Sequence, residues 1–331
     1  MGNIKLRGAL CALMTGVCWG FSGTVGQYLF TEKGVDRGWL TIVRLFGAGV
    51  VLLAYAALRC RGELFTVWKN KRDALRLVAF SVLGLMSCQY TYLAAISYSN
   101  AGTATALQYL GQAMIMAVVC IRARRLPTLR EGTALLLAMS GVFLLATHGR
   151  LDTLVLSPQA LLWGLLAALA LTLYTLLPGD LLKRYSAPVC TGFGMFIGGI
   201  ALFLITRGWT LTQPLDAVVV LGAAEIAIVG TALAFTLYLR AIADIGSVNA
   251  SLLICTEVLF AVLCTAVWLK THFAVEDVVG IALIVVMAVL LALPEKEKKN
   301  HKSRRKKNEK ISHIIIVRND DRSNDASNGV C

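Results

Sequence analysis

Three charged residues lie inside long apolar stretches of this 331-residue chain: Arg44, Glu225 and Glu257. A charge at the centre of a membrane helix costs about 2.5–3.5 kcal/mol on insertion scales, so such residues normally face a partner or a wet cavity. Glu225 and Glu257 each lie about ten residues into their stretch. Either carboxylate could bind a cationic group, carry a proton or serve as a hydrogen-bonded structural group. Arg44 lies nearer the start of its stretch and could extend toward the interface, which favours a structural role over a coupling role.

Uncharged polar and aromatic side chains add a surface that a small molecule could contact. Thr105, Gln108 and Gln112 recur at spacings that place them on one side of a helix. Amides and hydroxyls inside a membrane span either join helices or line a cavity, and this one-sidedness favours a cavity. For the aromatic candidates, ordinary packing is the alternative. The remaining candidates for cavity walls are Trp19, Gln89, Tyr92, Tyr174 and Ser251.

The chain shows no pattern typical of a catalytic, cofactor or metal site. It lacks a phosphate-binding GxxxxGK motif and an HExxH motif, and its nine cysteines form no CxxC pair. Cysteines in apolar runs behave as small hydrophobic residues. We therefore expect no catalytic residue, no bound metal and no cofactor. Any transport by this chain alone would be downhill or coupled to an ion gradient of protons or sodium.

The composition is that of a membrane protein. Hydrophobic residues make up 57% of the chain and charged residues 15%, whereas soluble domains carry about 25% charged residues. A helix needs about 20 apolar residues to cross the hydrocarbon layer. Ten such runs are predicted, over 8–29, 39–58, 75–97, 103–121, 131–148, 159–178, 189–206, 216–238, 247–268 and 276–293.

The net charge of +13 is concentrated in a few places. Eleven of the 32 Lys and Arg residues follow Pro294, and most of the others lie between the apolar runs. This distribution argues against nucleic-acid binding. If the N-terminus is cytoplasmic, the inner connections carry fifteen positive residues before the tail and the outer connections five. Because Lys and Arg favour cytoplasmic loops, both termini are predicted to be cytoplasmic.

An internal duplication organises the apolar runs. At an offset of 146 residues, Gly84 matches Gly230, Tyr92 matches Tyr238, and five further pairs are identical between positions 93 and 253. Each copy spans the same short break between two runs. Five runs per copy is an odd number, so the second copy must be inverted relative to the first. Inverted repeats are characteristic of transporters, whose site lies near the midplane where the halves meet.

Two features together resemble a known family. One is the segment 230–242, GTALAFTLYLRAI, followed by a polar turn and a predicted helix with Glu257; the other is Trp19-Gly20 late in the first run with Arg44 in the second. This pattern is similar to the EamA family of the drug/metabolite transporter superfamily. The resemblance implies ten helices in an inverted repeat, a central cavity, and export or uptake of small metabolites. The chain departs from the family at Gln112 and Val258, where proline is usual.

The sequence thus predicts an all-α integral membrane protein of ten transmembrane helices in two inverted five-helix repeats. We expect a secondary transporter, not an enzyme, that exports a small organic metabolite such as an amino acid across the cytoplasmic membrane by alternating access. Its expected partners are a small-molecule substrate, membrane lipid and a proton or sodium ion. A membrane scaffold or signalling protein is the alternative, and a membrane enzyme a weaker one. The expected domains are an N-terminus over 1–7, repeats over 8–148 and 159–293, a linker over 149–158 and a basic disordered tail over 294–331.

Overall fold

The computed structural model describes residues 2–59, 64–150 and 155–292, and in these ranges the chain is helical, with no strand. Helices are expected in lipid because they satisfy their own backbone N–H and C=O groups. Nine of the described helical stretches are long and apolar enough to cross a membrane, and a tenth apolar helix is shorter. The predicted fold class, ten apolar helical segments without strands, is confirmed.

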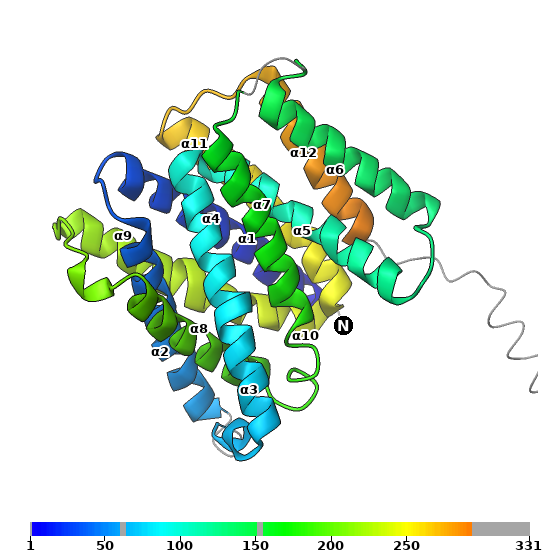
Figure 1. Ribbon diagram of the computed structural model, residues 1–331. Coiled ribbons are helices and arrows are strands. Elements are labelled where there is room, and N and C mark those ends of the chain that lie inside the picture. Colours follow the sequence, from blue (N-terminus) through cyan, green and yellow to red (C-terminus); the bar gives the residue numbers. More distant parts are fainter. Residues whose placement is uncertain (1, 60–63, 151–154, 293–331) are drawn as a thin grey trace, which may run out of the picture. The chain divides into compact units, whose positions relative to one another are not determined.

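The two halves contain the same series of segments (Figure 1). The first half consists of α1 (Gly2–Thr31), α2 (Arg37–Arg59), a third segment of α3 (Lys71–Ala79), η2 (Phe80–Met86) and α4 (Ser87–Tyr98), then α5 (Ala101–Arg122) and α6 (Leu129–Thr147). The second consists of α7 (Pro158–Leu176), α8 (Ala187–Ile205), a third segment of α9 (Ala217–Ala227), η4 (Ile228–Leu233) and α10 (Ala234–Ile254), then α11 (Thr256–Trp268) and α12 (Val275–Ala292). The short turns η1 (Thr66–Lys69) and η3 (Gly208–Thr210) lie in connections.

The ninth predicted segment differs from the structure. The sequence predicts one run over 247–268, but its first part belongs to α10, and α11 begins only at Thr256. Gly246 bends α10 with φ at +81°, a conformation that a residue with a Cβ atom rarely adopts. The helix is interrupted again at Cys255. As a result, Glu257 lies in the first turn of α11 and not in the middle of a continuous helix.

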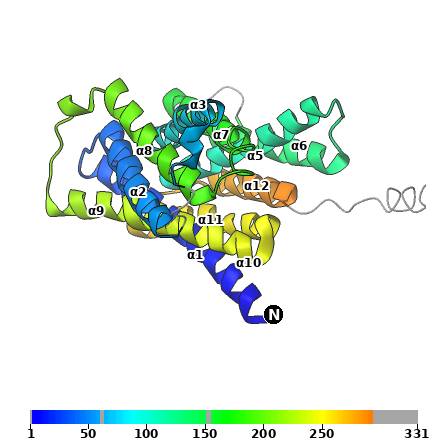
Figure 2. The ribbon, with the colours of Figure 1, turned by 90° about the horizontal axis from the view of Figure 1, so that it is seen from below.

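The halves pack in a crossed arrangement. α1 of the first half packs against α10 and α11 of the second, and α7 of the second half packs against α4 and α5 of the first. α2 pairs with α8, and α6 with α12, which lie side by side in both ribbon views (Figures 1 and 2). Each contact is therefore repeated when the halves are exchanged, as an internal two-fold arrangement requires.

The third segment of each half contains a π-helical turn. These turns, η2 and η4, include Gly84 and Gly230, the residues that the sequence matched at an offset of 146. π-turns are rare, occur mostly as single turns inside α-helices and are frequent at functional sites. Their recurrence at matched positions supports the duplication that the sequence predicted.

The same offset relates the starts of other helices. Asn70 caps α3, and Asp216 caps α9. The carboxylate of Glu131 accepts a hydrogen bond at 2.7 Å from the backbone N–H three residues before it, and Asp277 does the same at 3.0 Å. Side-chain caps satisfy backbone N–H groups that have no partner within the helix. The third and fifth segments of the two halves therefore begin in the same way.

Close backbone approach is clearest where α1 meets α11. A Cβ atom at Gly20 would lie 2.8 Å from the backbone nitrogen of Ala261 and 2.8 Å from the carbonyl oxygen of Glu257. Small residues let helices approach in lipid, where no hydrophobic force draws them together. Gly20 therefore sets how closely α1 lies to the turn that carries Glu257.

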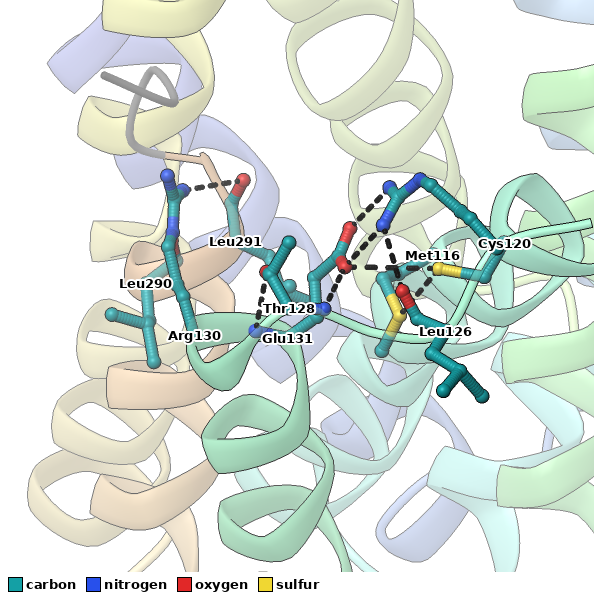
Figure 3. Close-up of polar contacts among 9 residues, drawn as sticks. Met116, Cys120, Leu126, Thr128, Arg130, Glu131, Leu290 and Leu291 are labelled. Atoms are coloured by element: carbon teal, nitrogen blue, oxygen red, sulfur yellow. Dashed lines mark hydrogen bonds and ion pairs between the residues drawn. The ribbon is translucent and has the colours of Figure 1, made fainter. Parts of the chain in front are cut away.

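Arg130, at the start of α6, contacts the end of α12. Its guanidinium donates from Nε to the carbonyl oxygen of Leu290 at 2.6 Å and from Nη2 to that of Leu291 at 3.2 Å (Figure 3). The last carbonyl groups of a helix lack internal partners and carry a partial negative charge, so a cation is favourable there. The neighbouring Thr128 and Glu131 form the cap of α6. This contact joins the two halves at the outer pair of helices.

Candidate functional site

Arg44 is buried where the two halves meet. Its side chain comes from α2, is 6% exposed, and donates from Nε to the hydroxyl oxygen of Thr231 in η4 at 2.9 Å. This is its one hydrogen bond within the described part of the chain. Four groups are close enough to act electrostatically on the guanidinium: Tyr92 and Cys88 in the first half, and Glu225 and Glu257 in the second. The three charges that the sequence singled out are thus brought together across the interface between the halves.

Thr231 makes two contacts with its hydroxyl group. It accepts from Arg44 and donates to the carbonyl oxygen of Ile226, five residues earlier, at 2.7 Å. A π-turn alters the regular pairing of a helix, and this hydroxyl satisfies a carbonyl at the turn. Thr231 is 1% exposed. It is not among the sequence-predicted site residues, although it directly follows Gly230, one of the duplicated glycines.

Glu257 is held by a tyrosine from α5. Its Oε2 atom accepts from the hydroxyl of Tyr109 at 3.2 Å, and the same hydroxyl lies 3.2 Å from the carbonyl oxygen of Ile254. Glu257 is 8% exposed. Its position in the first turn of α11 favours a negative charge, because a helix carries partial positive charge at its N-terminus. Tyr109 was also missed; its signal is its place four residues after Thr105, on the predicted polar face of α5.

Glu225 differs from Glu257 in having no hydrogen-bond partner among the described residues. Both of its carboxylate oxygens are buried, and neither is bonded within the described residues. The hydroxyl oxygen of Ser22, on α1, is buried and unbonded in the same way. An ionised carboxylate is costly in such surroundings unless it is paired. Glu225 is therefore the residue of this cluster that most needs a proton, a cation or the free donors of Arg44.

The predicted polar face of α5 is partly occupied by internal contacts. Thr105 is fully buried, and its hydroxyl lies 2.9 Å from that of Tyr92 and donates to a backbone carbonyl at 2.7 Å. Gln108 contacts the sulfur of a cysteine in α4 at 3.5 Å. Gln112 is half-buried and Gln89 is buried, and neither makes a hydrogen bond within the described residues. The donors and acceptors of these two amides are therefore not used by any described residue.

The aromatic candidates lie against the π-turns. Trp19 of α1 packs edge-on against Phe235, just after η4, with ring centroids 5.4 Å apart. Tyr174 of α7 stacks on Phe80, at the start of η2, at 5.8 Å. In each case the first helix of one half contacts the π-turn of the other. The side chain of Ser251 lies outside the described residues.

The described residues offer no alternative chemical site. No group of three or more His, Cys, Asp or Glu side chains could hold a metal ion there. The seven cysteines that the structure describes are free thiols. The charged cluster of Arg44, Glu225 and Glu257 is therefore the candidate site in this part of the chain.

Comparison with known proteins identifies the family. The EamA-like transporter family matches residues 6–147 and again 158–293. A Salmonella typhimurium protein named "Uncharacterized inner membrane transporter YicL" is 34% identical over 298 residues, which are 90% of this chain and 99% of that protein. One solved crystal structure shares the fold with a TM-score of 0.57 at 17% identity, over 87% of this chain and 97% of the other. The chain, built as two matched five-segment halves around a buried charged cluster, belongs to the EamA-like transporter family of membrane transporters.

Proposed function

We propose that this membrane transporter is a secondary exporter of a small organic metabolite, such as an amino acid, across the cytoplasmic membrane. One observation carries the proposal: Arg44 from the first half lies buried near Glu225 and Glu257 from the second. A guanidinium group binds carboxylates through paired N–H donors. A carboxylate binds an ammonium group. A zwitterion placed between the halves would satisfy both signs of charge.

Alternating access is the mechanism that the architecture supports. Transporters with inverted repeats bind substrate at the repeat interface and move one part against the other around that site. Here the first helix of each half packs on the other half, so rocking one half would move the contacts around the charged cluster. The Lys and Arg bias of the connections supports cytoplasmic termini.

Ion coupling would reside in the carboxylates. Glu257 or Glu225 would exchange a proton or hold a sodium ion as the cluster opens to each side. Glu257 already accepts a hydrogen bond from Tyr109, whereas Glu225 has no bonded partner within the described residues. To bind a proton or a sodium ion, the carboxylate of Glu257 would have to give up its hydrogen bond from Tyr109, whereas that of Glu225 has no such bond to a described residue to give up.

The test is a substrate screen in proteoliposomes that contain the full chain, with and without a pH gradient. The wild type is compared with Glu257→Gln, and Glu32→Gln serves as the control because Glu32 is exposed at the end of α1. We expect flux of one substrate class, reduced about tenfold or more in Glu257→Gln, the effect of removing a hydrogen bond to a charged group. Unchanged, gradient-independent flux in Glu257→Gln would remove Glu257 from the coupling role.

Deletion of residues 296–331 separates transport from a scaffold role. This segment carries eleven Lys and Arg residues, which a signalling or scaffold protein would use to bind partners or anionic lipid. A transporter should keep its flux without it. If the truncated chain inserts into membranes but loses its cellular activity while the wild type shows no flux for any substrate class, the scaffold role is favoured.

A further inference from the structure

At both π-turns a side-chain hydroxyl donates to the backbone carbonyl five residues earlier, but only one of these hydroxyls is contacted by a charged residue. In η2 the carbonyl oxygen of Val82 accepts from the hydroxyl of Ser87, five residues on, at 2.9 Å. In the second half Thr231 of η4 donates at the same spacing to the carbonyl of Ile226, near the end of α9. Only the hydroxyl in η4 also receives a charged donor from the other half, the Nε atom of Arg44. Of the two duplicated turns, η4 is therefore hydrogen-bonded to Arg44 of the charged cluster and η2 is not.

Glu225 lies near the end of α9, three residues before η4 begins. It directly precedes Ile226, and its two carboxylate oxygens are buried and accept no hydrogen bond from the part of the chain that the structure describes. The charged or titratable groups that face it from the packed elements are Cys18 on α1 and Arg44 on α2. Arg44 is the one cation among them. Its Nε donates to Thr231, so a carboxylate that binds the guanidinium side-on, through Nε and one Nη, would displace this hydroxyl.

We propose that Glu225 and Thr231 compete for Arg44, so that the charge on Glu225 determines whether η4 is held to α2. This inference concerns regulation of the site in the proposed function and rests on it to that extent. When Glu225 is neutral, Arg44 stays on Thr231. When Glu225 is ionised, the guanidinium moves to the carboxylate, a stronger acceptor than a hydroxyl, and the π-turn is released.

The ligand in this proposal is a proton. Ca²⁺ and Mg²⁺ take six or more oxygen ligands, whereas Glu225 offers two buried oxygens that no described residue bonds. A single proton neutralises the carboxylate without further ligands. The release would matter for movement because η4 touches α1 closely: a Cβ atom at Gly230 would collide with the side chain of Ser22.

Hydrogen–deuterium exchange tests the proposal without a substrate. The purified full chain is labelled between pH 5 and pH 9, and exchange is corrected for its intrinsic pH dependence. We expect the protection of peptides over 226–234 to fall about tenfold as pH rises, the effect of losing a hydrogen bond to a charged group. Peptides over 80–86, which contain η2, should show no such change and serve as the internal control.

Four variants separate the roles. Glu225→Gln should keep η4 protected at every pH, and Thr231→Val should leave it poorly protected at every pH. Thr231→Ser should restore the wild-type profile, because it keeps the hydroxyl. Thr236→Val is the matched control: its hydroxyl donates to the carbonyl of Ala232 at 2.8 Å in the same helix, and its removal should leave the pH profile unchanged.

Three results would overturn the proposal. One is a wild-type profile over 226–234 that does not change with pH, which needs no variant to interpret. Another is a pH dependence that survives in Glu225→Gln. The third is a pH dependence that is lost in Glu257→Gln but survives in Glu225→Gln. This result would mean that the charge on Glu257, and not that on Glu225, controls the protection of η4. Absence of flux for any tested substrate would count against the proposed function but would not alter these exchange profiles.

Discussion

Lys33 and Asp216 form an ion pair at 2.7 Å that joins the first half of the chain to the second. Lys33 follows α1, and Asp216 caps α9. A second junction uses the connection between α7 and α8, where Arg184 donates to Asp73 of α3 at 3.1 Å. The duplication relates these junctions: each joins the connection after the first helix of one half to the start of the third segment of the other. In an inverted repeat they lie at opposite ends, so both ends are tied in this structure.

The buried carboxylate of Asp73 should contribute more to the free energy of unfolding than the exposed carboxylate of Asp180. Asp73 is 2% exposed and accepts from Arg184 and, at 3.0 Å, from the hydroxyl of Tyr185. Burial, and next the bond to Asp73, raise the pKa of Tyr185. We expect Asp73→Ala to lower the free energy of unfolding by about 2 kcal/mol, since hydrogen bonds to a charged group are lost. Unfolding in mixed detergent micelles measures this value.

Asp180→Ala is the control for that comparison. Asp180 lies in the same region, but its side chain is 60% exposed and its contacts to Arg76 and Lys183 are 3.6 and 3.7 Å long. Exposed ion pairs contribute about 0–1 kcal/mol. Equal losses of stability in Asp73→Ala and Asp180→Ala would show that the Asp73 contacts do not hold the halves together.

The junction of Lys33 and Asp216 should weaken in acid. The hydrogen bond from Lys33, and next that from the backbone of Val219, hold the pKa of Asp216 below its usual value. A depressed carboxylate pKa stabilises the fold above the pKa of the unfolded chain, about 3.9, and this stability is lost as pH falls through the folded value. Asp216→Asn should therefore be less stable than the wild type near pH 7, and the difference in stability should shrink as pH falls below the unfolded pKa and through the folded one.

Asparagine is the informative replacement at position 216 because it can still cap a helix. Asn70 caps α3 at the matched position of the first half, and Asn and Asp are comparable caps. The change therefore removes the charge and keeps the cap. Melting temperatures measured from pH 3 to pH 8 provide the check. A constant difference across that range would assign the loss to the cap and not to the ion pair.

Gly20 should tolerate no side chain. A Cβ atom there would press on backbone atoms of α11, which cannot turn aside as a side chain can, so Gly20→Ala should cost about 1–3 kcal/mol. Gly132→Ala is the control, because no atom lies within 4 Å of the position of its Cβ atom. It should be neutral or stabilise by up to about 1 kcal/mol. Unfolding in detergent compares the two, and similar effects would contradict the close contact between α1 and α11.

Most of the architecture could be predicted from the sequence, because a helix that crosses lipid must be a long apolar run. Apolar length predicts where helices cross the membrane, and the matched glycines Gly84 and Gly230 predict the repeat. The π-turns that contain these glycines were not predicted, since a π-turn changes backbone pairing without changing hydrophobicity. Nor was the bend at Gly246, because glycines also lie inside straight helices and hydrophobicity does not distinguish the two cases.

Only part of the charged cluster could be predicted from the sequence. Arg44, Glu225 and Glu257 could be selected because a charge in an apolar run is rare and costly. Their partners Thr231 and Tyr109 could not, since hydroxyl groups are common in membrane helices and most bond to their own backbone. Which hydroxyl meets which charge depends on how the two halves cross, and one sequence does not determine that register.

Tyr109 gives the most direct test of how Glu257 is held. In Tyr109→Phe the ring still fills its place but donates no hydrogen bond, so the buried carboxylate of Glu257 loses its 3.2 Å contact. We expect unfolding to become easier by about 1–3 kcal/mol, the cost of leaving a buried group unsatisfied. Tyr174→Phe is the matched control, because Tyr174 stacks on Phe80 and makes no hydrogen bond within the described residues. In the double variant with Glu257→Gln, the effect of Tyr109→Phe should shrink, since the two changes remove the same contact. Additive losses would mean that the tyrosine acts through the carbonyl of Ile254 instead, and that Glu257 is held by other means.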